Sequence, residues 1–279
     1  MSKKILVLGA TGTVGRPLVN GLLLRGETVK AASRSGQAVE GAEGTPFDFA
    51  EPHTLAAALE GVDRAYVLMP AGYLNVQALL LPFIQAAAER NVKVVFQSVI
   101  GVDADDAIPY RQVEIALENA GTPYVILRPN WFSDNFHTFW KQGLDHGQIA
   151  LPAAEGKSSF IDARDIADSA IAALTSGAFD GQAFNLNGPE ALTYAEAAAI
   201  LSDVTGQPLR YTATSDEAFI EMLKSGGVPA DYATFMASIF HPVRAGWTGA
   251  VTDDVVTLTG TLPRTLRTYA RDNVALLTR

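Results

Sequence analysis

Short apolar runs alternate with amphipathic segments along the first half of the chain. The run at residues 4–8 is rich in branched apolar side chains, which is typical of a buried strand in a parallel sheet. Residues 14–23 carry apolar side chains at helical spacing, with Pro17 near the start and Gly26 past the end, which predicts a helix. Further strands are predicted at 27–34, 45–49, 64–70, 92–98 and 122–127, and helices at 51–61, at 76–90 and up to about residue 120.

This regular order of strands and helices predicts an α/β fold, a doubly wound parallel Rossmann sheet with right-handed crossovers. From Thr193 the pattern changes to short helices separated by turns, which predicts a smaller, mostly helical C-terminal lobe that selects the substrate. We expect an NAD(P)-binding Rossmann domain at 1–190, with 131–150 as a mobile pocket flap, and a substrate-binding lobe at 191–279. The helices of the lobe are predicted at 194–204, 216–224, 231–240 and 253–259.

A glycine-rich turn connects the first predicted strand to the first predicted helix. Its three glycines are spaced three residues apart. Without side chains there, a pyrophosphate approaches the backbone closely, and the helix N-terminus favours its negative charge. This context, between a strand and a helix, predicts a dinucleotide site. The predicted cofactor-binding residues of the turn are Gly9, Thr11, Gly12, Thr13, Val14 and Gly15.

The end of the second predicted strand indicates which dinucleotide binds. In sites that prefer NAD an acidic residue here binds the ribose hydroxyls, but this chain has Ser33 and Arg34. A guanidinium beside a hydroxyl suits the 2′-phosphate of NADP, because arginine offers a charged, bidentate contact. The alternative is that Arg34 is a solvated loop residue. We expect NADP(H) to be preferred over NAD(H).

Other predicted site residues lie near the carboxyl ends of the strands, where ligands bind in such sheets. Asp48 ends the third predicted strand, where it either accepts a hydrogen bond from the adenine amino group or caps the next helix. Pro70 interrupts the fourth strand at the same edge. The predicted cofactor contacts here are Asp48, Phe49, Met69, Pro70 and Ser98, and Tyr73 and His241 are predicted in the substrate pocket.

Composition narrows the classes of function. The net charge of −9 and the lack of any basic run argue against nucleic acid or an anionic membrane as the main partner. Without cysteine the chain has no disulfide and no catalytic thiolate, which fits a reducing cytosol. The four histidines show no metal-ligand spacing, and no apolar run approaches the ~18 residues of a membrane span. We therefore expect a cytoplasmic protein without a metal that acts on a small molecule.

Five motifs make the sequence similar to one branch of the atypical short-chain dehydrogenases/reductases. They are GATGTVG at 9–15, YRQVE at 110–114, LRPNWFSDNF at 127–136, FIDARDIA at 160–167 and FNLNGP at 184–189. The chain resembles the NmrA-like family over nearly its whole length. The resemblance implies NADPH-dependent reduction of quinones, of azo or triphenylmethane dyes or of iminium compounds, or nucleotide binding by a redox sensor. It also implies that Asn130, a cofactor contact, and Trp131, a substrate-pocket residue, border the nicotinamide.

Tyr110 is the candidate catalytic residue, and its surroundings depart from the typical short-chain dehydrogenases. Those enzymes have a Ser after the fifth strand and a Tyr four residues before a Lys. This chain has Ser98 and Tyr110, but Glu114 stands where the Lys is expected. A carboxylate one helical turn away raises the pKa of a phenol above its ordinary value of about 10, which favours a hydrogen-bond donor over a general base. The alternative is that Tyr110 only shapes the pocket beside the nicotinamide.

The missing Lys points to a substrate class. Hydride transfer to an alkyl ketone needs a positioned acid, whereas a quinone, an iminium or another conjugated acceptor gives a stabilised product that a weak donor protonates. The expected function is therefore reduction of an electrophilic conjugated compound with NADP(H). One alternative is a redox-sensing regulator that binds the nucleotide without turnover. An epimerase or isomerase ranks third, because that chemistry normally needs the Tyr–Lys base.

Overall fold

The first strand and helix form where the apolar pattern predicts them. In the computed structural model, which describes residues 3–278, β1 covers Lys4–Leu8 and α1 covers Gly15–Leu24. All residues of β1 after Lys4 are buried, because the strand lies inside a sheet whose two faces are covered by helices. α1 buries Leu18, Val19 and Leu22 on one face.

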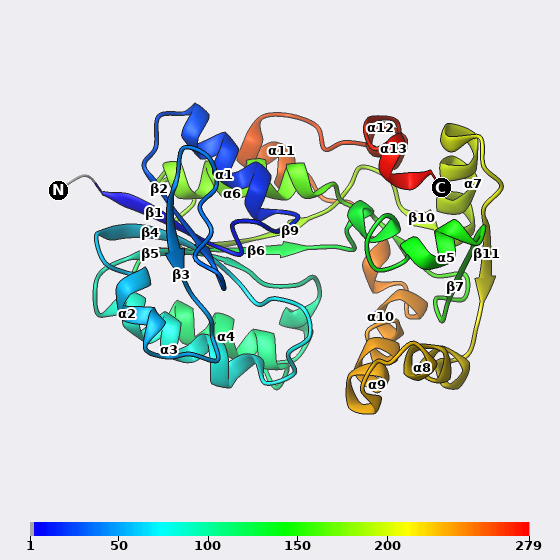
Figure 1. The fold of residues 1–279 in the computed structure, drawn as a ribbon, viewed down its shortest axis with the longest axis horizontal. Coiled ribbons are helices and arrows are strands. Elements are labelled where there is room, and N and C mark those ends of the chain that lie inside the picture. Colours follow the sequence, from blue (N-terminus) through cyan, green and yellow to red (C-terminus); the bar gives the residue numbers. More distant parts are fainter. Residues whose placement is uncertain (1–2, 279) are drawn as a thin grey trace. The chain divides into compact units, whose positions relative to one another are not determined.

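Seven parallel strands form the sheet, in the order β3-β2-β1-β4-β5-β6-β9 (Figure 1). The strands besides β1 are β2 Val29–Ser33, β3 Glu43–Pro46, β4 Val62–Leu68, β5 Lys93–Gln97, β6 Tyr124–Pro129 and β9 Gln182–Leu186. The strand order reverses between β1 and β4, and ligands of such sheets bind at the carboxyl ends beside this point. The predicted doubly wound Rossmann sheet is confirmed.

Helices cover both faces of the sheet (Figure 1). α1, α6 and α11 pack on one face, and α2, α3 and α4 lie on the other. Their bounds are α2 Thr54–Ala58, α3 Val76–Ala88, α4 Pro109–Glu118, α6 Ala163–Thr175 and α11 Asp254–Thr259, and the short helix η1 covers Val102–Ala104. On the α3–α4 side the core includes Leu80, Phe83, Phe96 and Leu117, all buried.

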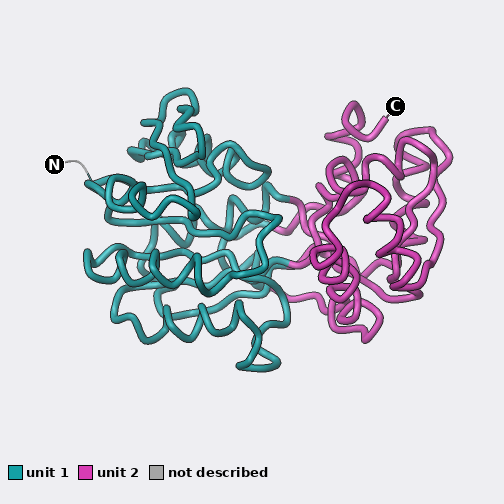
Figure 2. Tube along the Cα trace, turned by 60° about the horizontal axis from the view of Figure 1, so that its bottom comes forward, with its two compact units in different colours: residues 1–129, 163–186, 254–261 teal, residues 130–162, 187–253, 262–279 magenta. Residues whose placement is uncertain are grey.

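The chain forms two units that interleave in sequence (Figure 2). Unit 1 contains the sheet and its helices and comprises the chain up to Pro129, residues 163–186 and residues 254–261. Unit 2 comprises residues 130–162, residues 187–253 and the chain from Leu262 onward. None of the described helices combines the length and apolarity that a membrane span requires.

Unit 2 is mostly helical, with two small ladders. β7 (Gln148–Leu151) pairs in parallel with β11 (Arg210–Ala213), and β8 (Lys157–Ser158) pairs antiparallel with β10 (Leu192–Thr193). Its helices are η2 Ser133–Phe136, α5 Lys141–Asp145, α7 Tyr194–Thr205, α8 Asp216–Ser225, α9 Ala230–Ser238, α10 His241–Arg244, η3 Trp247–Gly249, α12 Leu266–Asp272 and α13 Val274–Leu277. Aromatic side chains dominate its core, among them Phe136, Trp140, Phe160, Tyr194 and Phe240.

Some predicted boundaries differ from the structure. The expected division at residue 190 does not coincide with the two units, because the chain passes between them five times. The helix expected at 253–259 in the lobe is α11, which belongs to unit 1 and packs on α6 and β9. The helix expected at 231–240 is α9, Ala230–Ser238, which ends two residues earlier than expected, and the separate short helix α10 begins at His241 with Pro242 in its first turn.

The stretch 131–150, expected as a flap, is built into unit 2. It contains η2, α5 and most of β7, and the side chains of Trp140 and Leu144 are buried in the core of that unit. Lys141 Nζ also donates a hydrogen bond to the Thr278 carbonyl at 3.3 Å. Buried apolar contacts and a tertiary hydrogen bond connect this segment to the rest of unit 2, and its movement as a pocket flap stays a prediction.

Candidate functional site

The glycine-rich turn links the carboxyl end of β1 to the N-terminus of α1. Gly9 adopts a φ of +64°, in the left-handed region that favours glycine. A Cβ at Gly15 would lie 2.0 Å from the Gly9 carbonyl oxygen, so only glycine lets the helix begin this close to the strand. A Cβ at Gly12 would meet only that same oxygen, at 3.1 Å. Gly15 is therefore needed for packing, whereas Gly12 leaves the exposed side of the turn open.

This turn has the shape and charge that a dinucleotide phosphate needs. Thr11, Gly12 and Thr13 are exposed, whereas Val14 and Gly15 are buried. Val14 at the N-cap has an apolar side chain, so the positive end of the helix dipole acts on the exposed turn without a capping side chain. The residues present fit a bound pyrophosphate, and their contact with the cofactor stays a prediction.

Ser33 and Arg34 lie at the carboxyl end of β2, which pairs with β1. The Arg34 side chain is exposed. Ser33 is half-buried, and its hydroxyl donates a long hydrogen bond of 3.4 Å to the Gln37 carbonyl. Because β1 and β2 run in parallel, these residues share the sheet edge of the glycine-rich turn. An exposed guanidinium at this edge suits a phosphate on the adenosine ribose.

Asp48 lies beyond β3, in the turn before α2. Its Oδ1 accepts a hydrogen bond from the Ala50 backbone N–H at 2.9 Å, which forms an Asx turn. α2 begins six residues later at Thr54, so Asp48 does not cap it, and the capping alternative is wrong. Phe49 packs edge-on against Phe47, with ring centroids 4.8 Å apart. Contacts of Asp48 and Phe49 with adenine stay predictions.

Three further predicted residues follow β4, and Ser98 follows β5. Met69 is buried, Pro70 is exposed, and Tyr73 is half-buried against the core of unit 1. Ser98 is fully buried, and its hydroxyl has no hydrogen-bond partner among the described residues. Burying a hydroxyl without a partner destabilises a protein by about 1–3 kcal/mol. We therefore expect the Ser98 hydroxyl to bond a group that binds at the end of β5.

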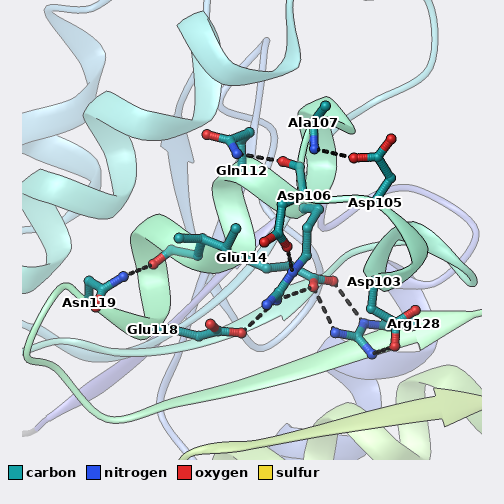
Figure 3. A network of polar contacts seen from close by, with 11 residues as sticks. Asp103, Asp105, Asp106, Ala107, Gln112, Glu114, Glu118, Asn119 and Arg128 are labelled. Carbon is teal, nitrogen blue, oxygen red and sulfur yellow. Dashed lines mark hydrogen bonds and ion pairs between the residues drawn. The ribbon is translucent and has the colours of Figure 1, made fainter.

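Tyr110 lies in the first turn of α4, and its ring stacks on Phe96 of β5 with centroids 6.3 Å apart. One turn later the Glu114 carboxylate is fully buried. Its Oε1 accepts a hydrogen bond from Arg128 Nε at 3.0 Å, and its Oε2 accepts from Arg128 Nη2 at 2.8 Å (Figure 3). Arg111 Nη1 donates a third bond to Oε2, at 3.1 Å. The Glu114 carboxylate therefore binds two guanidinium groups, whereas from the sequence we considered only its effect on Tyr110.

Arg128 and Arg111 are residues near this site that the sequence analysis did not single out. A signal for Arg128 was present, because it interrupts the apolar run of β6 at the carboxyl end. An arginine at a buried position needs a carboxylate partner. The identity of that partner was not readable, since it depends on which face of α4 packs against β6.

Asn130, the first residue of unit 2, is buried, and its side-chain amide makes three hydrogen bonds. The amide nitrogen donates to Asn187 Oδ1 at 2.8 Å and to the Thr248 carbonyl at 2.7 Å. Its Oδ1 accepts the Trp131 backbone N–H at 2.8 Å. These bonds fix the chain where unit 2 begins, and both amide hydrogens that would serve a nicotinamide are already donated.

The other two predicted pocket residues in unit 2 differ in burial. Trp131 is half-buried, and its ring packs on Phe240 with centroids 4.8 Å apart. His241 is exposed and stands edge-on to Trp247, with centroids 5.7 Å apart. Both are aromatic surfaces on which a planar ligand stacks favourably. Their contact with a substrate stays a prediction.

The groups at the carboxyl edge of unit 1 support binding and orientation rather than strong acid–base catalysis. A backbone cradle and an exposed guanidinium suit a phosphorylated dinucleotide. The buried Ser98 hydroxyl lies after β5, and the Tyr110 phenol lies in the first turn of α4. Among the described residues, no group of three or more His, Asp or Glu side chains gathers as metal ligands do.

Several known proteins are similar to this chain over nearly its whole length. The chain is 34% identical over 278 residues to the uncharacterized oxidoreductase YesF of Bacillus subtilis, covering 98% of this chain and 96% of that protein. It is 33% identical to the NAD(P)H azoreductase of Xenophilus azovorans, covering 97% and 98% of the two chains. The fold matches the NADPH-dependent quinone oxidoreductase of Escherichia coli complexed with NADPH at a TM-score of 0.83 and 23% identity, over 96% and 99% of the chains.

The sequence profile of the NmrA-like family matches residues 1–245, which include the glycine-rich turn, Tyr110 and the Glu114–Arg128 pair. The chain therefore belongs to the NmrA-like family.

Proposed function

We propose that this protein is an NADP(H)-dependent reductase that transfers a hydride from the nicotinamide to an electrophilic conjugated small molecule of the quinone, azo or iminium type. The observation that carries the proposal is the glycine-rich turn. Its Gly15 packs the start of α1 onto the Gly9 carbonyl, and its Gly12 keeps the exposed side free of a side chain. That arrangement matches the phosphate site of Rossmann folds.

The relatives support the reductase class. One of them is the NAD(P)H azoreductase at 33% identity, and another is quinone oxidoreductase 2 of Escherichia coli, at 26% identity over 84% of this chain. Both names refer to a conjugated acceptor, which is an azo compound in the first protein and a quinone in the second. We therefore propose the broad class of conjugated acceptors for this chain.

Within this function the glycine-rich turn binds the pyrophosphate. Arg34 binds the 2′-phosphate with Ser33 beside it, which explains a preference for NADP(H) at a strand end without a carboxylate. When bound, the cofactor supplies the hydride. The protein residues hold the nicotinamide ring and the acceptor in line and exclude water.

Ser98 and Tyr110 are the proposed polar contacts at the reacting end. The buried Ser98 hydroxyl gains a hydrogen bond when the nicotinamide end of the cofactor or the acceptor binds. Tyr110 donates a hydrogen bond to the acceptor. A Tyr without a neighbouring Lys is a weak acid–base catalyst. A conjugated acceptor tolerates this weakness, because its reduced product is stabilised and takes its proton from a weak donor or from solvent.

A nucleotide-binding redox sensor is the second candidate. The observation that favours it is the carboxylate of Glu114, which occupies the catalytic Lys position and is fully engaged with Arg128 and Arg111. A sensor needs the cofactor site but no proton donor. It binds NADPH and reduces none of the acceptors.

The test is the loss of reduced-nicotinamide absorbance with NADPH and NADH, against quinones, azo dyes, iminium compounds and simple aldehydes. We expect turnover of a conjugated acceptor with NADPH preferred. Arg34→Ala removes a charged hydrogen bond worth about 1.5–3 kcal/mol, so it lowers the NADPH-to-NADH preference by about 10- to 100-fold. Arg25→Ala, at an exposed arginine that contacts the Gly21 carbonyl on α1, is the matched control and leaves the preference unchanged.

Two other results contradict parts of the proposal. Tight NADPH binding without turnover of any acceptor favours the sensor. Equal use of NADH and NADPH by the unaltered protein shows that Arg34 is a solvated loop residue.

A further inference from the structure

Six charged side chains form one connected network in unit 1 (Figure 3). They are Asp103, Asp106, Arg111, Glu114, Glu118 and Arg128. At its centre the fully buried Glu114 carboxylate meets Arg128, whose side chain is 8% exposed, through two parallel hydrogen bonds. Arg128 Nη1 donates to Asp103 at 2.6 Å. Arg111 donates to Asp106 at 3.1 Å and to Glu118 at 2.7 Å.

The network joins three segments, and each lies next to one of the proposed site residues Ser98, Tyr110 and Asn130. Asp103 belongs to η1 in the connection after Ser98, Glu114 lies one turn beyond Tyr110 on α4, and Arg128 lies near the carboxyl end of β6.

Backbone hydrogen bonds run beside Arg128 as well. The Ser98 N–H donates to the Leu127 carbonyl at 2.8 Å, and the Ile100 N–H donates to the Pro129 carbonyl at 3.2 Å. Arg128 therefore lies between the two residues that fix the chain after β5, and its side chain fixes α4.

Stability alone does not require charges at this place. The preceding residues of β6, Val125, Ile126 and Leu127, are fully buried and apolar. Removing an ion pair from water costs about as much as the attraction returns, and a well-packed apolar pair is often equally stable. What an apolar pair lacks is a fixed direction, which the planar fork of a guanidinium on a carboxylate supplies.

We propose that Glu114 and Arg128 are positioning residues for the reduction. Their bidentate pair holds the first turn of α4, with Tyr110, in one orientation against the carboxyl ends of β5 and β6. This role rests on the proposed reductase function. It also explains why Glu114 stands where the typical enzymes have Lys. In those enzymes the Lys ammonium acts on the Tyr phenol, whereas here the Glu114 carboxylate binds Arg128 on the neighbouring strand β6.

The test replaces the pair by apolar side chains of similar length, in the double variant Glu114→Met with Arg128→Met. The NADPH-loaded protein is used throughout. Apolar packing restores a melting temperature near that of the unaltered protein. Without the directed contact, kcat for the best acceptor still falls by about 10- to 100-fold, since small misplacements of reacting groups cost this much. The Kd for NADPH stays close to that of the unaltered protein, because the glycine-rich turn and Arg34, the proposed phosphate contacts, are not part of the network.

Two further variants separate positioning from stability. Arg128→Lys keeps the charge and loses the fork, so it lowers kcat with little effect on the melting temperature. The matched control is Glu27→Met with Arg64→Met, a second Glu–Arg pair of unit 1 at the opposite, amino end of β4. This control leaves kcat unchanged whatever its effect on stability.

A second readout does not depend on turnover. In the double Met variant we expect faster hydrogen exchange of the hydrogen-bonded backbone amides at 112–114 than in the unaltered protein, at equal melting temperature. Recovery of kcat together with the melting temperature, or unchanged exchange at 112–114, overturns the positioning role. If the unaltered protein reduces no acceptor, the proposed function fails, and the exchange measurement alone decides on the positioning role.

Discussion

Gly12 and Gly15 make different contributions although they belong to the same turn. A Cβ at Gly15 meets backbone at 2.0 Å, so Gly15→Ala forces the start of α1 away from Gly9. Overpacking of this kind costs about 1–3 kcal/mol, and we expect a lower melting temperature together with loss of NADPH binding. Gly12→Ala meets only the Gly9 oxygen, so stability changes by less than about 1 kcal/mol while the added methyl weakens NADPH binding.

Thermal unfolding and a fluorescence titration with NADPH distinguish these outcomes for both variants. The turn is not the phosphate site if Gly12→Ala binds NADPH as tightly as the unaltered protein.

At the scale of residues, local sequence predicted the parts of the site whose chemistry is local. The spacing of Gly9, Gly12 and Gly15 specifies a turn geometry, and the turn has the expected shape. Glu114 was recognised as unusual, but its partner Arg128 lies on another strand, and a pairing across 14 residues depends on how α4 packs. The hydrogen bonds of the Asn130 amide were equally impossible to predict from the sequence, because its partner Thr248 is 118 residues away in the chain.

At the scale of elements, the contact between His137, just after η2, and Tyr269 of α12 makes stability depend on pH. His137 Nδ1 and the Tyr269 hydroxyl are hydrogen-bonded. Burial, and to a smaller extent the charge of Lys141, lowers the pKa of His137 below its ordinary value of about 6.5. The folded protein therefore binds this proton less readily than the unfolded chain. The contribution to stability is complete above about pH 6.5 and is lost as the pH falls through the folded pKa.

His137→Gln keeps a hydrogen-bonding side chain and removes this titration. We expect the melting temperature of the unaltered protein to fall more between pH 7.5 and pH 5.5, values set about one unit either side of the ordinary pKa, than that of the variant. Carboxylates titrate in both proteins, so the difference between them reports His137. Equal losses contradict the prediction.

The elements of the sheet were predictable where both faces of a strand are buried. β1, β4 and β5 contain the buried apolar runs 5–8, 65–67 and 94–96, which are typical of central strands in a parallel sheet. β9 was not recognised, because its first two residues, Gln182 and Ala183, are exposed and the run is short. α11 was assigned to the lobe, since an apolar face six residues long does not reveal which unit it packs against.

At the scale of the whole molecule, cutting the chain at residue 190, the expected domain boundary, removes contacts on which both units depend. A fragment of residues 1–190 keeps Trp140 and Phe160 but lacks Tyr194, whose ring centroid lies 5.7 Å and 5.3 Å from theirs. It also lacks α11, which packs on α6 and β9 in unit 1. We therefore expect the fragment to unfold without cooperativity and to bind NADPH more weakly than the full chain.

Circular dichroism during heating and an NADPH titration, with the full chain in parallel, test this expectation. A fragment that unfolds cooperatively and binds NADPH with full affinity contradicts it, and shows that 1–190 is an independent folding domain.

The interleaved connectivity also sets the order in which the sheet is completed on the ribosome. β6 ends at Pro129, whereas its neighbour β9 ends at Leu186, about 57 residues later. At synthesis rates of 5–20 residues per second, the open edge of β6 waits roughly 3 to 11 s for its partner. Val125, Ile126 and Leu127 form an apolar strand that other nascent chains can pair with during this time. The chain is therefore most prone to aggregation while it is being synthesised. We expect a chaperone to bind residues 125–127 during translation.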